Sequence, residues 1–315
     1  MKQTKKGFVL MVVFVLFLLL NIFAIMHSYK MTHFTDSGNK PPKPESLTGL
    51  DKFKILLTGI EVPKPPNERV PLSIKYEVLK FSGYNNTVLE AWLLKGLKKD
   101  EIVLMFHGYA ESKTQLIPEA LKFVSKGYNV MLVDFYGSGG SAGNSTSVGY
   151  HEADDVKAAY KKAVELGYKN IYLFAVSMGS AASIMAINVY GIKPKSMIIE
   201  SPFAGLLDTV RRRFDLMNIP SWPLAEIFVF WGSVVSGYNG FTFNPAELAK
   251  NVNVPVLILH GSLDKRVSIT QAELLNDSLK GKKKLVIFSK AGHLSFMQSD
   301  EGLWDKEVFE WIGSK

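Results

Sequence analysis

The chain has 315 residues, contains no cysteine and carries a net charge of +8. The lack of cysteine excludes disulfide bonds, zinc sites built on thiolates and cysteine nucleophiles. The basic residues form no stripe with interleaved aromatic residues, so nucleic-acid binding is not expected. The six histidines are scattered and none pair at i, i+4 spacing, so no metal site is expected. The length exceeds one typical domain of about 150 residues, but α/β folds of about 200–250 residues often form one unit.

An apolar segment runs from Gly7 to Met26, with Asn21 as its one polar residue. Twenty helical residues rise about 30 Å, which is the thickness of the hydrocarbon core of a bilayer. Three lysines precede the segment and only Lys30 follows closely. By the positive-inside rule, residues 1–30 are therefore expected to form a cytoplasmic tail and a single-pass signal anchor, with the rest of the chain outside the cytoplasm.

The alternative for this segment is a cleaved signal peptide. The apolar run is longer than the usual apolar region of such a peptide, of about 7–15 residues, and its end lacks a small-x-small cleavage site. We therefore expect an uncleaved anchor that contacts the membrane through residues 7–26. Residues 31–66 predict an extended linker and an irregular arm, because they are polar and contain the proline clusters 41–44 and 63–66.

Short apolar runs alternate with helical patterns through residues 67–315, which are expected to form the folded domain. Runs such as Ile102–Phe106 and Val256–Leu259 suit strands buried on both faces of a parallel sheet. The first two strands are expected to pair as a hairpin around Gly83–Asn86. Strands are predicted at 72–79, 88–94, 102–106, 130–134, 171–176, 197–200, 256–260 and 285–289. Helices are predicted at 115–126, 152–166, 178–190, 269–280 and 301–312. This alternation predicts a doubly wound α/β fold with a mostly parallel sheet of eight strands and helices on both faces.

The stretch that says most about function is residues 171–179, where a strand pattern runs into Ala175-Val176-Ser177-Met178-Gly179. A serine with small residues at −2 and +2, between a buried strand and a helix, is the pattern of a nucleophile elbow. Ala175 stands where the usual G-x-S-x-G pattern has its first glycine and adds one methyl group. By itself the pattern also fits an ordinary strand–helix junction, so the partners of Ser177 decide its meaning.

An activated serine needs a base, and the base needs a group that orients it. In this fold the three residues occur in the order serine, acid, histidine. Asp264 follows the seventh predicted strand and His293 follows the eighth, so both lie in loops that open on the sheet edge where Ser177 is expected. We expect His293 to take the proton of Ser177 and Asp264 to orient the imidazole. Glu200, at the end of the sixth strand, is the alternative acid.

The developing oxyanion needs hydrogen-bond donors. The backbone N–H of Met178, directly after Ser177, is one candidate. The backbone N–H of Tyr109 is the second, because Gly108 lets that loop approach a substrate closely. His107 and His260 are expected to form hydrogen bonds within their own loops rather than to act as the base.

A glycine-rich stretch, Gly137–Ala142, matches the G-x-G-x-x-A pattern of dinucleotide sites. The next helix is predicted to begin only near Glu152, too late to present its N-terminus to a pyrophosphate. No second strand ends in an acid about 20 residues on. No cofactor is therefore expected.

Residues 203–250 break the strand–helix rhythm and contain an aromatic run around Trp222 and Phe228–Trp231. An insertion after the sixth strand predicts a small cap over the site. Two alternatives stay open at this point. The segment can be a helix pair that completes the core, or its aromatic helix can enter the membrane interface.

These motifs resemble those of serine hydrolases of the α/β-hydrolase superfamily, over about residues 72–312. The likeness is strongest to the branch that groups serine-aminopeptidase-like and lysophospholipase-like proteins with membrane-anchored ABHD-type hydrolases. Tyr136 departs from it, because this branch commonly has an arginine there that stabilises the loop. The motifs that carry the resemblance are His107-Gly108-Tyr109, Asp134–Gly143, Gly149–Asp155, the elbow at Ser177, His260-Gly261 with Asp264, and Gly292-His293.

The resemblance implies a serine hydrolase that cleaves ester or thioester bonds through an acyl-enzyme on Ser177. The anchor and the apolar insertion suggest a lipid-like or other small acyl substrate. A peptidase or an acyltransferase of the same fold is the alternative reaction. A non-catalytic binding protein of this fold is the alternative from another class, although such a protein is expected to have lost a member of the triad.

Overall fold

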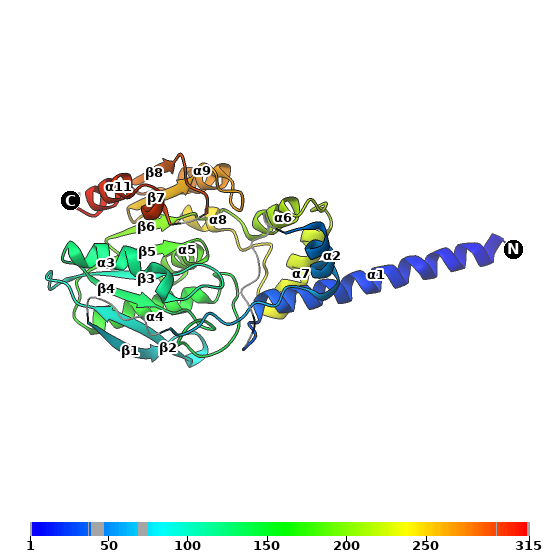
Figure 1. Cartoon of the computed structure of the whole chain (residues 1–315), viewed down its shortest axis with the longest axis horizontal. Coiled ribbons are helices and arrows are strands. Elements are labelled where there is room, and N and C mark those ends of the chain that lie inside the picture. The colour runs from blue at the N-terminus through cyan, green and yellow to red at the C-terminus, as the bar shows by residue number, and fades with distance from the viewer. Residues whose placement is uncertain (1, 37, 39–46, 69–74, 294, 314–315) are drawn as a thin grey trace.

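The computed structural model describes residues 2–36, 38, 47–68, 75–293 and 295–313. Its centre is one eight-stranded sheet with the strand order β1-β2-β4-β3-β5-β6-β7-β8 (Figure 1). β1 and β2 form the expected antiparallel hairpin, β2 is antiparallel to β4, and all other neighbours are parallel. The strands are β1 (Tyr76–Ser82), β2 (Val88–Leu94), β3 (Glu101–Phe106), β4 (Asn129–Val133), β5 (Asn170–Val176), β6 (Ser196–Glu200), β7 (Val256–Gly261) and β8 (Lys283–Phe288).

The predicted strands are thus confirmed to within two residues, apart from the first, which begins at Tyr76. Residues 72–74 of that prediction lie outside the described residues. β4 and β6 are buried at every position because helices cover both faces of the sheet. β1 lies at the edge and is mostly exposed, so its apolar pattern is weaker.

Helices form a layer on each face of the sheet, and each layer has its own buried cluster. One cluster contains Phe123, Phe296 and Trp304, from α3, α10 and α11. The other joins α4, α5, α8 and α9. Their bounds are α3 (Ile117–Ser125), α4 (Glu152–Glu165), α5 (Met178–Tyr190), α8 (Pro245–Ala249), α9 (Ile269–Ser278), α10 (Phe296–Ser299) and α11 (Glu301–Gly313), with short 3-10 turns at Tyr84–Asn86 and Lys113–Leu116.

The N-terminal helix α1 (Lys2–Thr32) is longer than the predicted apolar segment and extends away from the domain (Figure 1). It is long and apolar enough to cross a membrane. Its side chains from Phe8 to Leu19 are exposed, whereas its C-terminal part packs on α7 (Leu224–Ser236). The polar Asn21 is accommodated in this apolar run because its Oδ1 accepts a 2.9 Å hydrogen bond from Trp231 Nε1.

The predicted linker contains a helix that the sequence analysis missed, α2 (Gly49–Thr58). Thr48 and Asp51 form a capping box at its start, with the Asp51 N–H donating to Thr48 Oγ1 at 3.2 Å and the Thr48 N–H donating to Asp51 Oδ2 at 3.0 Å. The extended reading of this part of the linker was therefore wrong. The sequence signal was the T-x-x-D pattern before an apolar run. The proline cluster 41–44 lies outside the described residues.

The insertion at 203–250 divides between two positions. α6 (Leu206–Leu216) and α7 pack on each other, and α7 packs on α1, at the side of the domain from which α1 leaves (Figure 1). α8, by contrast, packs on α5 and α9 within the core. Part of the insertion thus completes the core, and the rest joins the domain to the N-terminal helix.

Candidate active site

The turn between β5 and α5 places Ser177 in a strained backbone conformation, with φ 50° and ψ −108°. A β-carbon at Gly179 would lie 2.7 Å from the Phe106 carbonyl oxygen and 2.8 Å from that of His107. Only glycine therefore lets α5 start this close to the end of β3. The Ser177 N–H donates to the Glu200 carbonyl at 2.8 Å, which holds the turn against β6. Ala175 is fully buried in the core, so the extra methyl group is accommodated.

The structure brings Ser177, Asp264 and His293 together from the ends of three strands. His293 Nε2 lies 3.2 Å from Ser177 Oγ, and His293 Nδ1 lies 2.7 Å from Asp264 Oδ2. Both distances are within hydrogen-bonding range. The three side chains form one chain of hydrogen bonds, with the imidazole between the hydroxyl and the carboxylate.

Backbone groups hold Asp264 in this position. Its Oδ1 accepts hydrogen bonds from the N–H groups of Arg266 at 2.8 Å and Val267 at 3.0 Å. Burial alone would raise the pKa of Asp264, but the hydrogen bond and charge of His293 and these two N–H groups outweigh it and lower the pKa. Asp264 is therefore ionised at neutral pH and accepts a hydrogen bond from Nδ1–H of His293.

The loop after β3 runs beside the serine. A β-carbon at Gly108 would lie 3.8 Å from Ser177 Cβ, so the backbone of this loop approaches the turn closely. The next residue, Tyr109, donates from its hydroxyl to the Met31 carbonyl of α1 at 2.6 Å. Burial raises the pKa of Tyr109 to about 12, which keeps this hydroxyl protonated and a donor. Met178 begins α5, where the first backbone N–H groups of a helix have no partner within the helix.

His107 and His260 are confirmed as loop-stabilising residues. The Phe135 N–H donates to His107 Nε2 at 3.2 Å, so the proton of that ring lies on Nδ1, 2.8 Å from the Gly108 carbonyl. His260 Nε2 lies 3.1 Å from the Val267 carbonyl. Burial lowers the pKa of both histidines and keeps them neutral. Each therefore braces a loop that carries a candidate site residue.

The carboxylate beside His293 in this structure is that of Asp264, not that of Glu200. Glu200 Oε1 instead accepts a 2.8 Å hydrogen bond from Trp304 Nε1. Burial, together with the nearby Glu119, raises the pKa of Glu200 to about 8. Glu119 in turn accepts a hydrogen bond from Ser295, two residues after His293. This pair of buried acids supports the loop that bears the histidine.

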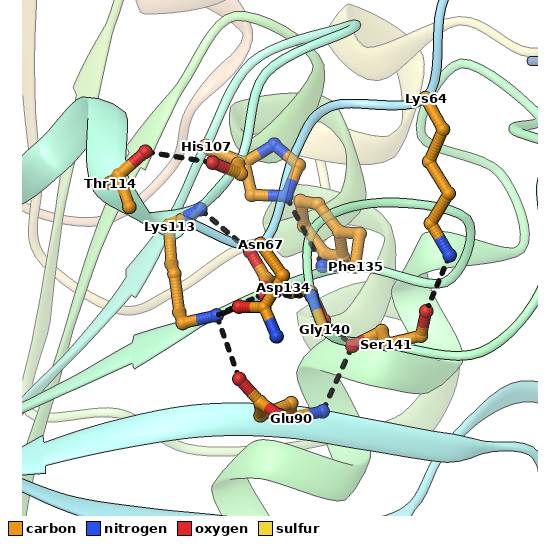
Figure 2. A network of polar contacts seen from close by, with 11 residues as sticks. Lys64, Asn67, Glu90, His107, Lys113, Thr114, Asp134, Phe135, Gly140 and Ser141 are labelled. Carbon is orange, nitrogen blue, oxygen red and sulfur yellow. Dashed lines mark hydrogen bonds and ion pairs between the residues drawn. The ribbon is translucent and has the colours of Figure 1, made fainter. Parts of the chain in front are cut away.

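A buried lysine, Lys113, which the sequence analysis missed, belongs to a polar cluster that connects the loops after β3 and β4 (Figure 2). Lys113 Nζ lies 3.1 Å from Glu90 Oε1, 3.1 Å from Asn67 Oδ1, and in contact with Asp134 Oδ2. The Lys113 backbone N–H donates to Asp134 Oδ1 at 2.7 Å, and Gly140 N–H donates to Asp134 Oδ2 at 2.8 Å. One carboxylate thus joins the loop after β3 to the glycine-rich loop after β4.

This cluster explains how the loop after β4 is held although Tyr136 replaces the arginine common in similar sequences. The Tyr136 N–H donates to Asp155 Oδ2 at 2.9 Å, and its ring fills the space where Gly143 has no side chain. Lys113 supplies the positive charge from a different loop. In the sequence it stands in a polar stretch, where a lysine usually has a solvated side chain, so no local signal marked it as buried.

The chain is similar to known proteins in part of its sequence and in its fold. The family model described as serine aminopeptidase, S33, matches residues 98–228, which include Tyr109, Ser177 and Met178. An esterase from Pyrococcus furiosus superposes with a TM-score of 0.66 at 22% identity, covering 80% of this chain and 98% of that one. An esterase from Exiguobacterium antarcticum superposes with a TM-score of 0.58 at 17% identity, covering 76% of this chain and 100% of that one.

The chain is also similar in sequence to several curated proteins. The uncharacterized protein YqkD of Bacillus subtilis is 25% identical over 67% of this chain and 70% of its own length. The acylamino-acid-releasing enzyme of Rattus norvegicus is 24% identical over 75% of this chain but only 33% of its own length. The chain has the α/β-hydrolase fold. Its residues 98–228 are similar to the serine aminopeptidases.

The Lys113 cluster gives the first prediction. Lys113→Met leaves Asp134 and Glu90 buried without their cation, which should lower the free energy of unfolding by about 3–5 kcal/mol. Denaturant titration of the detergent-solubilised chain measures this. Lys99→Met, which removes an exposed lysine, should change stability by less than about 0.5 kcal/mol. Equal effects of the two variants would contradict a structural role for Lys113.

Glu200 gives a prediction about pH. Its pKa in the folded chain, about 8, lies above that of an unfolded glutamate, so the folded state binds the proton more tightly. Stability should therefore fall as pH rises from about 4.5 to about 8, by about 1.4 kcal/mol per unit of pKa difference. Melting curves of Glu200→Gln should show a smaller decline over this range than the wild type. Parallel curves would show that Glu200 titrates normally.

Proposed function

We propose that the chain is a membrane-anchored serine hydrolase that cleaves ester or thioester bonds through an acyl-enzyme on Ser177. The observation that carries this proposal is the continuous set of hydrogen bonds from Ser177 Oγ through His293 to Asp264. Its members come from the strand ends where an α/β-hydrolase has its nucleophile, acid and base. The likeness to esterases supports the same reaction class.

In this mechanism His293 Nε2 takes the proton of Ser177 Oγ as the oxygen attacks the acyl carbonyl carbon. Asp264 keeps the other imidazole proton on Nδ1 and stabilises the imidazolium that forms. The backbone N–H groups of Tyr109 and Met178 would donate to the oxyanion of the tetrahedral intermediate. His293 then gives its proton to the leaving group, and a water molecule activated by the same imidazole releases the acyl group from Ser177.

A serine peptidase is the second candidate reaction, because the matched family is that of serine aminopeptidases and one relative releases acylated amino acids. The same acyl-enzyme can also pass its acyl group to an acceptor other than water, as an acyltransferase. A non-catalytic binding protein is disfavoured by the intact set of Ser177, His293 and Asp264. The three reactions share their first step, so one labelling experiment tests all of them.

Ser177→Ala should abolish labelling by a fluorophosphonate, which phosphonylates an activated serine. Asp264→Asn should lower kcat by roughly 10³–10⁴-fold, because the imidazole loses its orienting anion. Glu200→Gln should retain more than a tenth of the wild-type rate. Release of p-nitrophenol from p-nitrophenyl acetate measures the rates. No labelling of the folded wild-type chain would refute the hydrolase, and a severe loss in Glu200→Gln alone would reassign the acid.

The proposed orientation places the N-terminus in the cytoplasm and the hydrolase domain outside it. The chain has no cysteine, so single-cysteine variants report topology cleanly. Lys99→Cys in the exposed turn before β3 should react with a membrane-impermeant maleimide on intact cells. Lys5→Cys should react only after permeabilisation. The reverse pattern would place the domain in the cytoplasm. Release of the domain into the medium would indicate that the N-terminal segment is cleaved.

A further inference from the structure

A cavity of about 200 Å³ lies where the N-terminal helix meets the insertion helices. Its walls come from four helices or their flanks and are mostly apolar. α1 contributes Met31, α2 contributes Ile55, and α6 and α7 contribute Leu206, Phe214, Phe228 and Gly232. The helix that anchors the chain is therefore also a wall of this cavity.

One end of the cavity adjoins the candidate active site. Met31, in its wall, accepts the hydrogen bond from Tyr109, whose backbone follows the glycine beside Ser177. Val148 also lines the cavity, and a β-carbon on the following residue, Gly149, would lie 3.0 Å from the Met178 carbonyl oxygen. One loop beside the nucleophile thus lines the cavity through Val148, and the other contacts its wall through the hydrogen bond of Tyr109 to Met31.

The helices that line the cavity also carry apolar side chains on their exposed surfaces. The exposed apolar residues 8–19 of α1 rise only about 18 Å, less than the roughly 30 Å of a hydrocarbon core. The apolar layer must therefore extend along α1 to the level of α7 and α2. Exposed apolar side chains occur on both of these helices. They are Leu50, Phe53 and Leu57 along one side of α2, with Phe230 on α7 and Trp222 just before it.

α1, α2 and α7 thus all carry exposed apolar side chains, and the same three helices line the cavity. A hydrocarbon chain in the bilayer would pass from one apolar environment to another without crossing water. A peptide would need a partner for each backbone N–H and C=O group, and walls that are mostly apolar provide few of them.

We propose that this cavity binds the fatty acyl chain of a membrane lipid ester, which enters from the bilayer between α1, α2 and α7. This proposal rests on the proposed hydrolase function and names its substrate class. The acyl chain would lie along Met31, Phe228 and Gly232, and its ester carbonyl would reach Ser177 past Tyr109. The membrane helix would then take part in substrate selection in addition to anchoring the enzyme.

Gly232 offers a direct test, because a β-carbon there meets no atom within 4 Å. A side chain at this position therefore begins in open space, and the indole of Gly232→Trp is expected to occupy the cavity that this residue lines. The matched control is Val234→Trp, which adds an indole to an exposed position on the same helix. Both variants are compared with the full-length wild-type chain in phosphatidylcholine nanodiscs.

The measurement is the ratio of kcat/KM for palmitoyl-lysophosphatidylcholine to kcat/KM for p-nitrophenyl acetate. Gly232→Trp should lower this ratio at least tenfold, and Val234→Trp should leave it within twofold. An unchanged ratio in Gly232→Trp, or an equal loss in both variants, would overturn the proposal. So would a wild type that hydrolyses the acetate through Ser177 but not the lysolipid.

A binding measurement separates this proposal from the hydrolase function. In the Ser177→Ala background, titration with a dansyl-labelled fatty acid should give a dissociation constant that Gly232→Trp raises at least tenfold. If the wild type lacks serine reactivity but this binding is present, the hydrolase function fails and the acyl-chain site stands. If the serine reacts but Gly232→Trp does not weaken binding, the hydrolase stands and the acyl-chain site fails.

Discussion

The positive-φ turn at Ser177 is the constraint on which the rest of the site depends. It requires β5, α5 and the loop after β3 to approach within contact distance, which leaves no room for a side chain at Gly179. The Glu200 carbonyl fixes the turn from β6. A strained backbone persists only where contacts with its surroundings hold it in place, so the neighbouring loops must also be well fixed.

Buried charged and acidic side chains provide that fixation. Asp134 accepts hydrogen bonds from two loops at once. The positive charge of Lys113 pairs with the carboxylates of both Asp134 and Glu90. On the opposite side, Glu119 and Glu200 anchor the segment that follows His293. Each cluster is expensive to break in a low-dielectric interior, so both hold the loops around Ser177 in a single arrangement.

Much of the fold could be predicted from the sequence because the central strands are buried on both faces and read as unbroken apolar runs. The proximity of Ser177, Asp264 and His293 could be predicted because the ends of parallel strands lie at one edge of the sheet. Lys113 could not, since its burial follows from contacts with Glu90 and Asp134 that are distant in sequence. α2 was missed because proline-rich flanks outweighed its capping box. The division of the insertion between core and α1 depends on helix packing, which no local pattern encodes.

The hydrogen bond between Asn21 and Trp231 limits how the domain can move relative to α1. It joins the anchor to the domain within the folded body, so no flexible tether separates α1 from α7. A tethered domain would sample a hemisphere of solvent around its anchor. In the proposed membrane-anchored hydrolase, a domain fixed to its helix would keep Ser177 at one height and one tilt relative to the lipid surface. A lipid substrate would then arrive by lateral diffusion in two dimensions, and its relevant concentration would be a density per membrane area.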